Sequence, residues 1–273
     1  MDAKIRTIDA ARLERERRAE GELDLAAHGE LAEASGIGLT DTVVFQHPVI
    51  ALDEKRRESE RILAPGASGP TGGPYKMLRT QVMRRLAEHN ANTLAVLSAL
   101  NGDGKTLTAI NLAIAVAAQL GHTALLIELD LRNPSIHRRF GIEPRCGIED
   151  CIVQRRPVYE AMVKIAGYER LTVLPARAAV ANSSELLATQ RMSELVQELR
   201  TRYLNRVLIF DLPPVLLADD ALAFSQHVQA GLFVVAEGKT DRNAVTRSLA
   251  LLHKLPMIGT VLNHSQERLG GYY

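Results

Sequence analysis

The stretch Leu94–Thr106 constrains the fold of this chain more than any other. It reads LAVLSALNGDGKT, an apolar run followed by a turn with two glycines and then Lys-Thr at the start of an amphipathic segment. Glycines let backbone N–H groups converge on phosphate oxygens, a helix N-terminus adds partial positive charge, and a lysine adds a full one. The stretch therefore predicts a strand, a phosphate-binding loop and a helix, although the general pattern G-x-x-x-x-G-K-[ST] has glycine where this chain has Ala99.

Composition narrows the class of protein that carries this loop. The chain has 273 residues, 46% of them hydrophobic and 24% charged, which is enough to bury a full core. Its net charge of +1 gives no argument for a nucleic-acid partner or for an anionic membrane. The sequence has no apolar run of about 18 residues and is charged from Asp2 onward, so we expect neither a membrane span nor a signal peptide, and a cytoplasmic location.

Residues 1–64 differ from the rest and predict a charged N-terminal extension. Arg12–Ala34 and Asp53–Leu63 are rich in charged residues with few helix breakers, which favours solvated helices, and Thr40–Leu52 suggests a short strand. Such a segment fits a mobile arm and a docking arm for a partner equally well, because charged helices serve both purposes.

Residues 65–74 read PGASGPTGGP, and their density of glycine and proline predicts a linker. An amphipathic helix is expected next, over Tyr75–His89. It opens a domain that takes up residues 75–273 and carries the glycine loop.

Beyond that helix, short apolar runs alternate with longer helical patterns. The runs lack hydrophobic-polar alternation, which indicates strands buried on both faces, and the interleaved helices indicate parallel crossovers. The predicted fold class is therefore α/β, a doubly wound, mostly parallel sheet with helices on both faces. The expected strands are Thr93–Ala99, Thr123–Leu129, Leu171–Pro175, Arg206–Leu212, Gly231–Ala236 and Ile258–Leu262. The expected helices are Lys105–Leu120, Ser184–Tyr203, Asp219–Val228 and Arg242–Leu255.

Carboxylates end two of these strands. Glu128 and Asp130 close the strand Thr123–Leu129 two residues apart, hence on the same face, and Asp211 closes the strand Arg206–Leu212. In an open parallel sheet, ligands bind beyond the carboxyl ends of the strands, and Mg²⁺ on nucleotide phosphates takes hard oxygen ligands. We expect these carboxylates to meet the glycine loop in one nucleotide-binding site.

Together these motifs resemble those of the bacterial tyrosine kinases of capsular and extracellular polysaccharide synthesis. Ser98–Thr106 resembles their Walker A loop, S-x-x-P-G-E-G-K-[ST], which needs no glycine at the position of Ala99. Glu128–Arg132 resembles their acidic motif, D-x-D-x-R, and Asp211–Pro214 resembles their Walker B motif, D-[ST]-P-P. The resemblance covers about residues 75–273 and implies the P-loop NTPase fold that the ParA and MinD ATPases share.

The chain also departs from the pattern of that family. Glu128 replaces the first aspartate of D-x-D, and Leu212 replaces the Thr or Ser after the Walker B aspartate. The family's assembly motif, E-x-x-R-x-x-R, aligns on Gly73, Lys76 and Arg79, so its glutamate is missing and one arginine is a lysine. We expect these changes to affect catalysis more than nucleotide binding.

The resemblance implies a role for each site residue, with ATP and Mg²⁺ as the ligands. Lys105 would neutralise the phosphates and Asp130 would orient or deprotonate the attacking tyrosine, with Glu128 assisting. Asp211 completes the catalytic set, and the expected ligands of Mg²⁺ are Thr106, Asp130 and Asp211. The expected nucleotide-binding residues are Gly102, Asp103, Gly104, Lys105, Thr106, Leu107 and Asn263.

Two features near the C-terminus each allow two interpretations. Asn263 resembles the asparagine that reads adenine in related ATPases, and it equally suits a cap after the last strand. Tyr272 and Tyr273 follow two glycines, so they could be phosphoacceptors that reach a neighbouring subunit, or incidental aromatic residues of an untethered tail.

The implied function is that of an ATP-dependent protein-tyrosine autokinase that regulates exopolysaccharide or capsule polymerisation and export. Such a kinase would form a homo-oligomer and lie at the inner membrane only through a partner, a Wzz-like chain-length-determinant activator. One alternative is an ATP-binding regulator of the same system without kinase activity. Another is a ParA- or MinD-like ATPase, but those carry a second lysine near the start of the loop, where Ser98–Asn101 has none.

Overall fold

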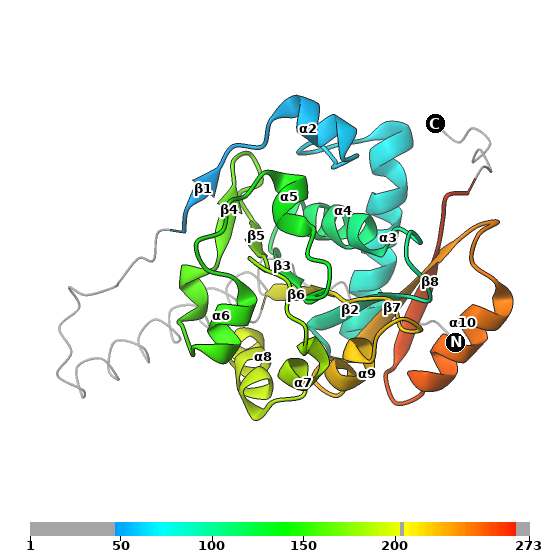
Figure 1. The fold of residues 1–273 in the computed structure, drawn as a ribbon. Coiled ribbons are helices and arrows are strands. Elements are labelled where there is room, and N and C mark those ends of the chain that lie inside the picture. Colours follow the sequence, from blue (N-terminus) through cyan, green and yellow to red (C-terminus); the bar gives the residue numbers. More distant parts are fainter. Residues whose placement is uncertain (1–46, 203–204, 266–273) are drawn as a thin grey trace, which may run out of the picture. The chain divides into compact units, whose positions relative to one another are not determined.

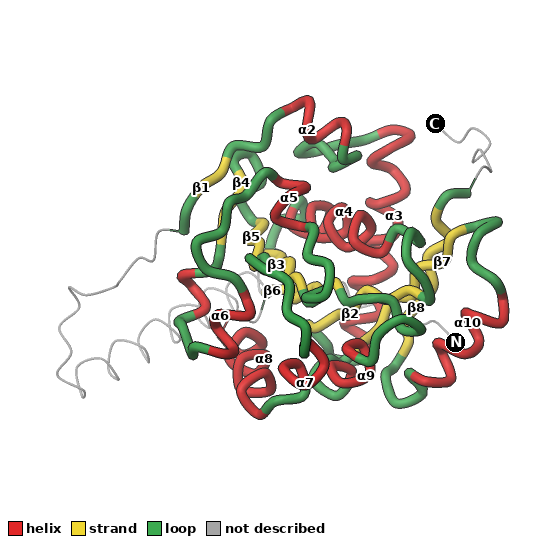
Figure 2. Tube along the Cα trace, in the orientation of Figure 1, coloured by secondary structure: helices red, strands yellow, loops and turns green. Residues whose placement is uncertain are grey.

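The computed structural model describes residues 47–202 and 205–265. Their strands form one eight-stranded sheet in the order β1-β4-β5-β3-β6-β2-β7-β8, which Figure 2 shows as a layer between helices. Neighbouring strands are parallel except for β4 and β5, so the predicted fold class is confirmed. The strands are β1 (Val49–Ile50), β2 (Thr93–Ser98), β3 (Thr123–Glu128), β4 (Val163–Ile165), β5 (Leu171–Leu174), β6 (Arg206–Asp211), β7 (Ala230–Ala236) and β8 (Met257–Asn263).

Helices cover both faces of this sheet (Figure 1). Helices α3, α4 and α5 bury side chains in a core on one face, and helices α6 to α10 bury side chains in a core on the other. The helices are α2 (Glu54–Ser59), α3 (Gly69–Glu88), α4 (Lys105–Ala117), α5 (Ile136–Phe140), α6 (Ile148–Val153), α7 (Ser183–Leu187), α8 (Gln190–Arg202), α9 (Asp220–Ser225) and α10 (Arg242–Leu251).

Strand β2 illustrates why the sheet needs helices on both sides. Its successive side chains point to opposite faces: Leu94 and Val96 enter the core under α3 and α4, whereas Ala95 and Leu97 enter the core under the other helices. All four are fully buried, so a strand of this composition is stable only when both faces are covered.

The sheet order sets which strand ends meet. Strand β2 lies between β6 and β7, and β3 lies on the far side of β6. Asp211 pairs in register with Val96 on one side and with Glu128 on the other. Because these strands are parallel, the loop after β2 and the acidic ends of β3 and β6 come together at one edge of the sheet.

The helix expected from Tyr75 begins earlier, at Gly69, so the second half of the segment expected to be a linker is helical. Pro70 explains the early start, because a proline in the first turn lacks an N–H that would have no helical partner there. Gly72 is buried, and a Cβ on it would meet the backbone of Ala67, so the helix packs closely on the preceding loop. Glycine and proline here serve the packing of a helix start.

The segment just before that loop belongs to the core, although residues 1–64 were expected to form a separate extension. Ile62 and Leu63 are buried. The backbone N–H of Leu63 donates to the side chain of Asn111 on α4 at 3.0 Å, and Tyr168 donates its hydroxyl to the carbonyl of Leu63 at 2.7 Å. The compact unit begins at His47, and the predicted helix over Arg12–Ala34 lies outside the described residues.

Two further differences have local causes. The single helix expected over Ser184–Tyr203 is split into α7 and α8 because Thr189 caps the second helix, its hydroxyl accepting from the N–H of Met192 at 3.2 Å. Strand β4 was not predicted, since its three residues are too few to form a pattern. Within the part of the chain that the structure describes, no helix has both the length and the apolar character needed to cross a bilayer.

Candidate functional site

The loop between β2 and α4 depends on two glycines in the left-handed region. Gly102 has φ of 81° and Gly104 has φ of 90°, values that residues with a side chain rarely adopt. The Asp103 carboxylate accepts from the backbone N–H of Leu100 at 3.0 Å and from the hydroxyl of Thr240 at 2.7 Å. Asp103 therefore holds the shape of the loop with its side chain, and α4 begins directly after Gly104.

Asn263, at the end of β8, lies against this loop. Its side-chain amide donates to the backbone carbonyl of Asp103 at 2.9 Å, and its amide nitrogen contacts the place that a Cβ would take on Gly104. Glycine at this position thus allows both the left-handed turn and the close approach of Asn263. The expected nucleotide-binding residue Leu107 lies in the first turn of α4 and is half-buried.

Lys105 joins the loop to two acidic strand ends. Its ammonium group lies 2.9 Å from Asp130 Oδ2, 3.9 Å from Asp211 Oδ1 and 3.3 Å from the hydroxyl of Thr106. Burial would lower the pKa of Lys105, but Asp211 and Asp130 outweigh it and raise the pKa above its ordinary value. The lysine is therefore charged. Lys105, Thr106, Asp130 and Asp211, which were expected to share one site, do lie together.

Asp211 is the most deeply buried member of this group, with no exposed surface. Among the described residues, neither of its carboxylate oxygens has a hydrogen-bond partner. Burial raises its pKa to about 6, although Lys105 opposes the shift. A buried carboxylate with Lys105 as its ion-pair partner at 3.9 Å and lone pairs left over, beside a threonine hydroxyl, is a donor set that Mg²⁺ takes, so these residues fit the ion.

Glu128 has a different environment from the one expected of an assisting catalytic group. It is fully buried, and its carboxylate accepts from the backbone N–H groups of Ser135 and Ile136, at the start of α5, and from Ala176 at 3.1 Å. No hydrogen bond joins Glu128 to Lys105 among the described residues. Its contacts favour an anchoring role, in which the carboxylate fixes the end of β3 to α5 and to the loop after β5.

The partners of Arg132 and the contacts of the loop after β7 were not expected from the sequence. The Arg132 guanidinium bonds to Asp220 at 2.8 Å and to Asp219 at 3.1 Å, both at the start of α9. Thr240 and Lys239 follow β7 and contact the glycine loop. A signal for Lys239 and Thr240 was present, because the rule that ligands bind beyond strand ends applies to β7 as well.

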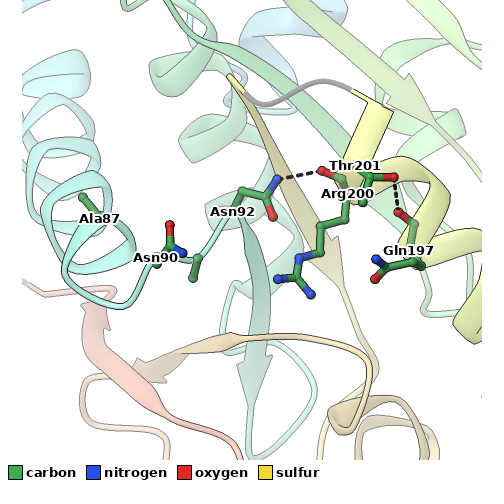
Figure 3. Close-up of a pocket in the computed structure, with 7 residues that line it drawn as sticks. Ala87, Asn90, Asn92, Gln197, Arg200 and Thr201 are labelled. Atoms are coloured by element: carbon green, nitrogen blue, oxygen red, sulfur yellow. Dashed lines mark hydrogen bonds between the residues drawn. The ribbon is translucent and has the colours of Figure 1, made fainter.

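One hollow among the described residues reaches the glycine loop. A groove of about 310 Å³ between α3 and β8 is lined by Tyr75, Leu78 and Val261 and reaches Asn263 beside the glycine loop. Another, of about 370 Å³, lies at the start of β2, where Asn92 donates to the carbonyl of Arg200 at 3.1 Å (Figure 3). The second hollow is at the opposite end of β2 from the loop and is separate from the site.

Leu212, Tyr272 and Tyr273 are the remaining residues that the sequence singled out. Leu212, which stands where the family has Thr or Ser, is fully buried in the core under α6 to α10. Tyr272 and Tyr273 lie outside the described residues, so their role as phosphoacceptors stays a prediction.

Comparisons with known proteins identify the family of this chain. The ParA family model, described as NUBPL iron-transfer P-loop NTPase, matches residues 89–268. Tyrosine-protein kinase YwqD of Bacillus subtilis (strain 168) is 30% identical over 204 residues, which are 73% of this chain and 84% of the relative. The succinoglycan biosynthesis transport protein ExoP of Rhizobium meliloti (strain 1021) is 32% identical over 196 residues, 68% of this chain but only 24% of the relative.

The solved kinase domain of VpsO is similar in structure as well. It has 27% sequence identity and a TM-score of 0.62, and the match covers 70% of this chain and 93% of that domain.

Proposed function

The chain belongs to the bacterial tyrosine kinases, within the ParA-like P-loop NTPases, and from this premise we propose that it transfers the γ-phosphoryl group of ATP to tyrosine. The observation that carries the proposal is the meeting of Lys105 and Thr106 with Asp130 and Asp211 beyond the ends of parallel strands. Phosphoryl transfer needs positioning and charge neutralisation more than covalent chemistry, and this cluster supplies both.

Each residue of the cluster has a role that its surroundings support. Lys105 neutralises the phosphates that the glycine loop binds. Thr106, Asp130 and Asp211 would hold Mg²⁺, and the ion would supply positive charge that neutralises the phosphate oxygens. Asp130 also orients the attacking tyrosine or accepts its proton. The groove beside Asn263 is the place for adenine, while the bond from Asn263 to the loop supports an additional role as an anchor.

The acceptors in this proposal are Tyr272 and Tyr273, phosphorylated between subunits of a homo-oligomer. The kinase would regulate exopolysaccharide or capsule polymerisation and export, together with a membrane chain-length-determinant protein that holds it at the inner membrane. The name of one relative, a succinoglycan biosynthesis transport protein, supports this setting.

A second candidate is an ATP-binding regulator without kinase activity. The contacts of Glu128 favour this candidate. Its carboxylate, which replaces the first aspartate of the D-x-D motif, accepts hydrogen bonds from three backbone N–H groups and is therefore less available for catalysis. This candidate predicts measurable ATP affinity and no transfer to tyrosine.

Intact-mass spectrometry before and after phosphatase treatment separates the two candidates. The protein is incubated with ATP and Mg²⁺, with and without the cognate membrane activator. The kinase predicts mass steps of one phosphate that map to Tyr272 or Tyr273 and are absent in Lys105→Met. ATP binding by calorimetry with no phosphotyrosine under either condition would leave only the regulator.

A further inference from the structure

Lys239 lies on the glycine loop although it comes from a distant part of the chain. It follows β7, and its ammonium nitrogen contacts the place that a Cβ would take on Gly102, with its Cε 3.7 Å from that place. A side chain at position 102 would therefore displace the lysine. The absence of a Cβ on Gly102 gives the ammonium group direct access to the loop that binds phosphate in the proposed function.

Hydrogen bonds fix the segment that carries Lys239. The hydroxyl of Thr240 donates to Asp103 of the glycine loop at 2.7 Å and accepts from the backbone N–H of Ala236 at 3.0 Å. The backbone N–H groups of Lys239 and Thr240 both donate to the carbonyl of Ala236, at 3.2 and 3.0 Å. This tight turn, bonded to a buried aspartate, places Lys239 at the loop.

The ammonium group of Lys239 has no carboxylate partner among residues 47–202 and 205–265. Lys105 differs, since Asp130 and Asp211 already balance its charge. Lys239 is also exposed, so its charge is open to a ligand that enters from solvent.

The charges of the loop region call for such a cation. Asp103, Asp130 and Asp211 all lie at or beside the glycine loop, and Lys105 is already paired with two of them. A polyphosphate adds several negative charges at the same place, and close like charges repel one another. A second ammonium group at Gly102 would offset this repulsion.

We propose that Lys239 is a second phosphate-binding cation of this site, supplied by the turn after β7 and acting beside Lys105 on the phosphate chain of a nucleotide. The proposal rests on the proposed function only in assuming that the glycine loop binds a nucleotide. In this proposal Lys239 contacts the ligand directly. Gly102 leaves room for its ammonium group, and the bond from Thr240 to Asp103 holds the turn that carries it.

Isothermal titration calorimetry tests this with Mg²⁺ and a non-hydrolysable ATP analogue. Lys239→Ala and Lys239→Gln are compared with wild type and with Lys254→Ala, which removes an exposed lysine after α10. We expect the Lys239 variants to bind about ten- to hundredfold more weakly, as for loss of a charged hydrogen bond. The Lys254 variant should match wild type, and Lys239→Arg should recover part of the affinity.

Salt dependence and melting temperature complete the test. The difference between wild type and the Lys239 variants should shrink as salt rises, because screening weakens a contact between exposed charges. Their melting temperatures should equal that of wild type. Equal affinity of Lys239→Ala, Lys239→Gln and wild type at low salt overturns this inference and leaves the proposed function intact. If wild type and Lys254→Ala bind no nucleotide at all, the proposed function itself fails.

Discussion

The ammonium group of Lys105 lies 2.9 Å from Asp130 Oδ2, an ion pair that joins the first residue of α4 to the end of β3. With Asp211 on its other side, the lysine is held between two strand ends and has little freedom before any ligand arrives. A charged group already in position needs little reorganisation during the reaction, which is the main source of electrostatic catalysis.

Replacing Lys105 by methionine should strongly slow phosphoryl transfer to tyrosine. The variant loses a charge contact that strengthens in the transition state, so phosphotyrosine formation should fall at least a hundredfold, equivalent to about 3 kcal/mol. Quantitative phosphotyrosine mass spectrometry measures this, with Lys254→Met as the matched control. Retention of more than a hundredth of the wild-type rate in Lys105→Met would contradict the role given to this lysine.

Asp211→Asn should weaken Mg²⁺-dependent nucleotide binding without lowering the thermal stability of the protein. Burial raises the pKa of Asp211 to about 6, so its ionised form opposes folding at pH 7 and an amide of the same shape should leave the melting temperature equal or higher, with Asp130 still paired to Lys105. Without the carboxylate, Mg²⁺ should no longer improve nucleotide affinity. Calorimetry with and without Mg²⁺ and thermal melts check both parts, with Asp241→Asn as the exposed control. A variant that keeps the Mg²⁺ dependence would exclude Asp211 as a ligand of the ion.

Substitution of Glu128 should lower the free energy of unfolding more than it lowers the rate of phosphotransfer. Glu128→Gln keeps the shape but weakens bonds to three backbone amides, and the free energy of unfolding should fall by about 1–3 kcal/mol. Glu128→Asp, which has the family's residue but a shorter reach, should destabilise the protein as well. Urea denaturation measures these changes against Glu143→Gln. A normal stability combined with a large loss of phosphotransfer would instead assign Glu128 to catalysis.

Most of the site was predictable because it follows from the order of strands and loops along the chain. The acidic residues end strands that the apolar runs mark clearly, and parallel strands bring those ends to one edge. The partners of Glu128 were not predictable, because Ala176 lies 48 residues away and donates a backbone N–H that no sequence pattern encodes. Lys239 follows a strand that was predicted, but its contact with Gly102 also depends on β7 lying next to β2, which the sequence did not show.

The fold was predicted well where hydrophobic patterns are long and poorly where a single residue decides. Six strands of the sheet appear close to their expected bounds. The start of α3 depends on Pro70, and the break between α7 and α8 depends on Thr189. Proline and threonine are also found in segments where they neither start nor break a helix. Tertiary packing selects between the two outcomes.

Asp150 should make the free energy of unfolding depend on pH. It accepts two bonds from the Arg177 guanidinium at 3.0 Å and one from the N–H of Gly147 at 2.9 Å, joining α6 to the loop that carries the partner of Glu128. The bonds from Arg177 lower the pKa of Asp150 below its ordinary value of 3.8, although burial opposes them. The ionised form is therefore favoured by folding.

A lowered pKa in the folded state fixes the sign of the pH effect. The ionised carboxylate adds stability above pH 3.8, and that stability disappears as the pH falls through the lower pKa of the folded protein. Asp150→Asn should reduce the free energy of unfolding by about 1–3 kcal/mol at pH 7. The difference from wild type should persist down to about pH 4 and shrink below it. Urea titrations at several pH values, with Asp241→Asn as control, would refute this if the difference grew on acidification.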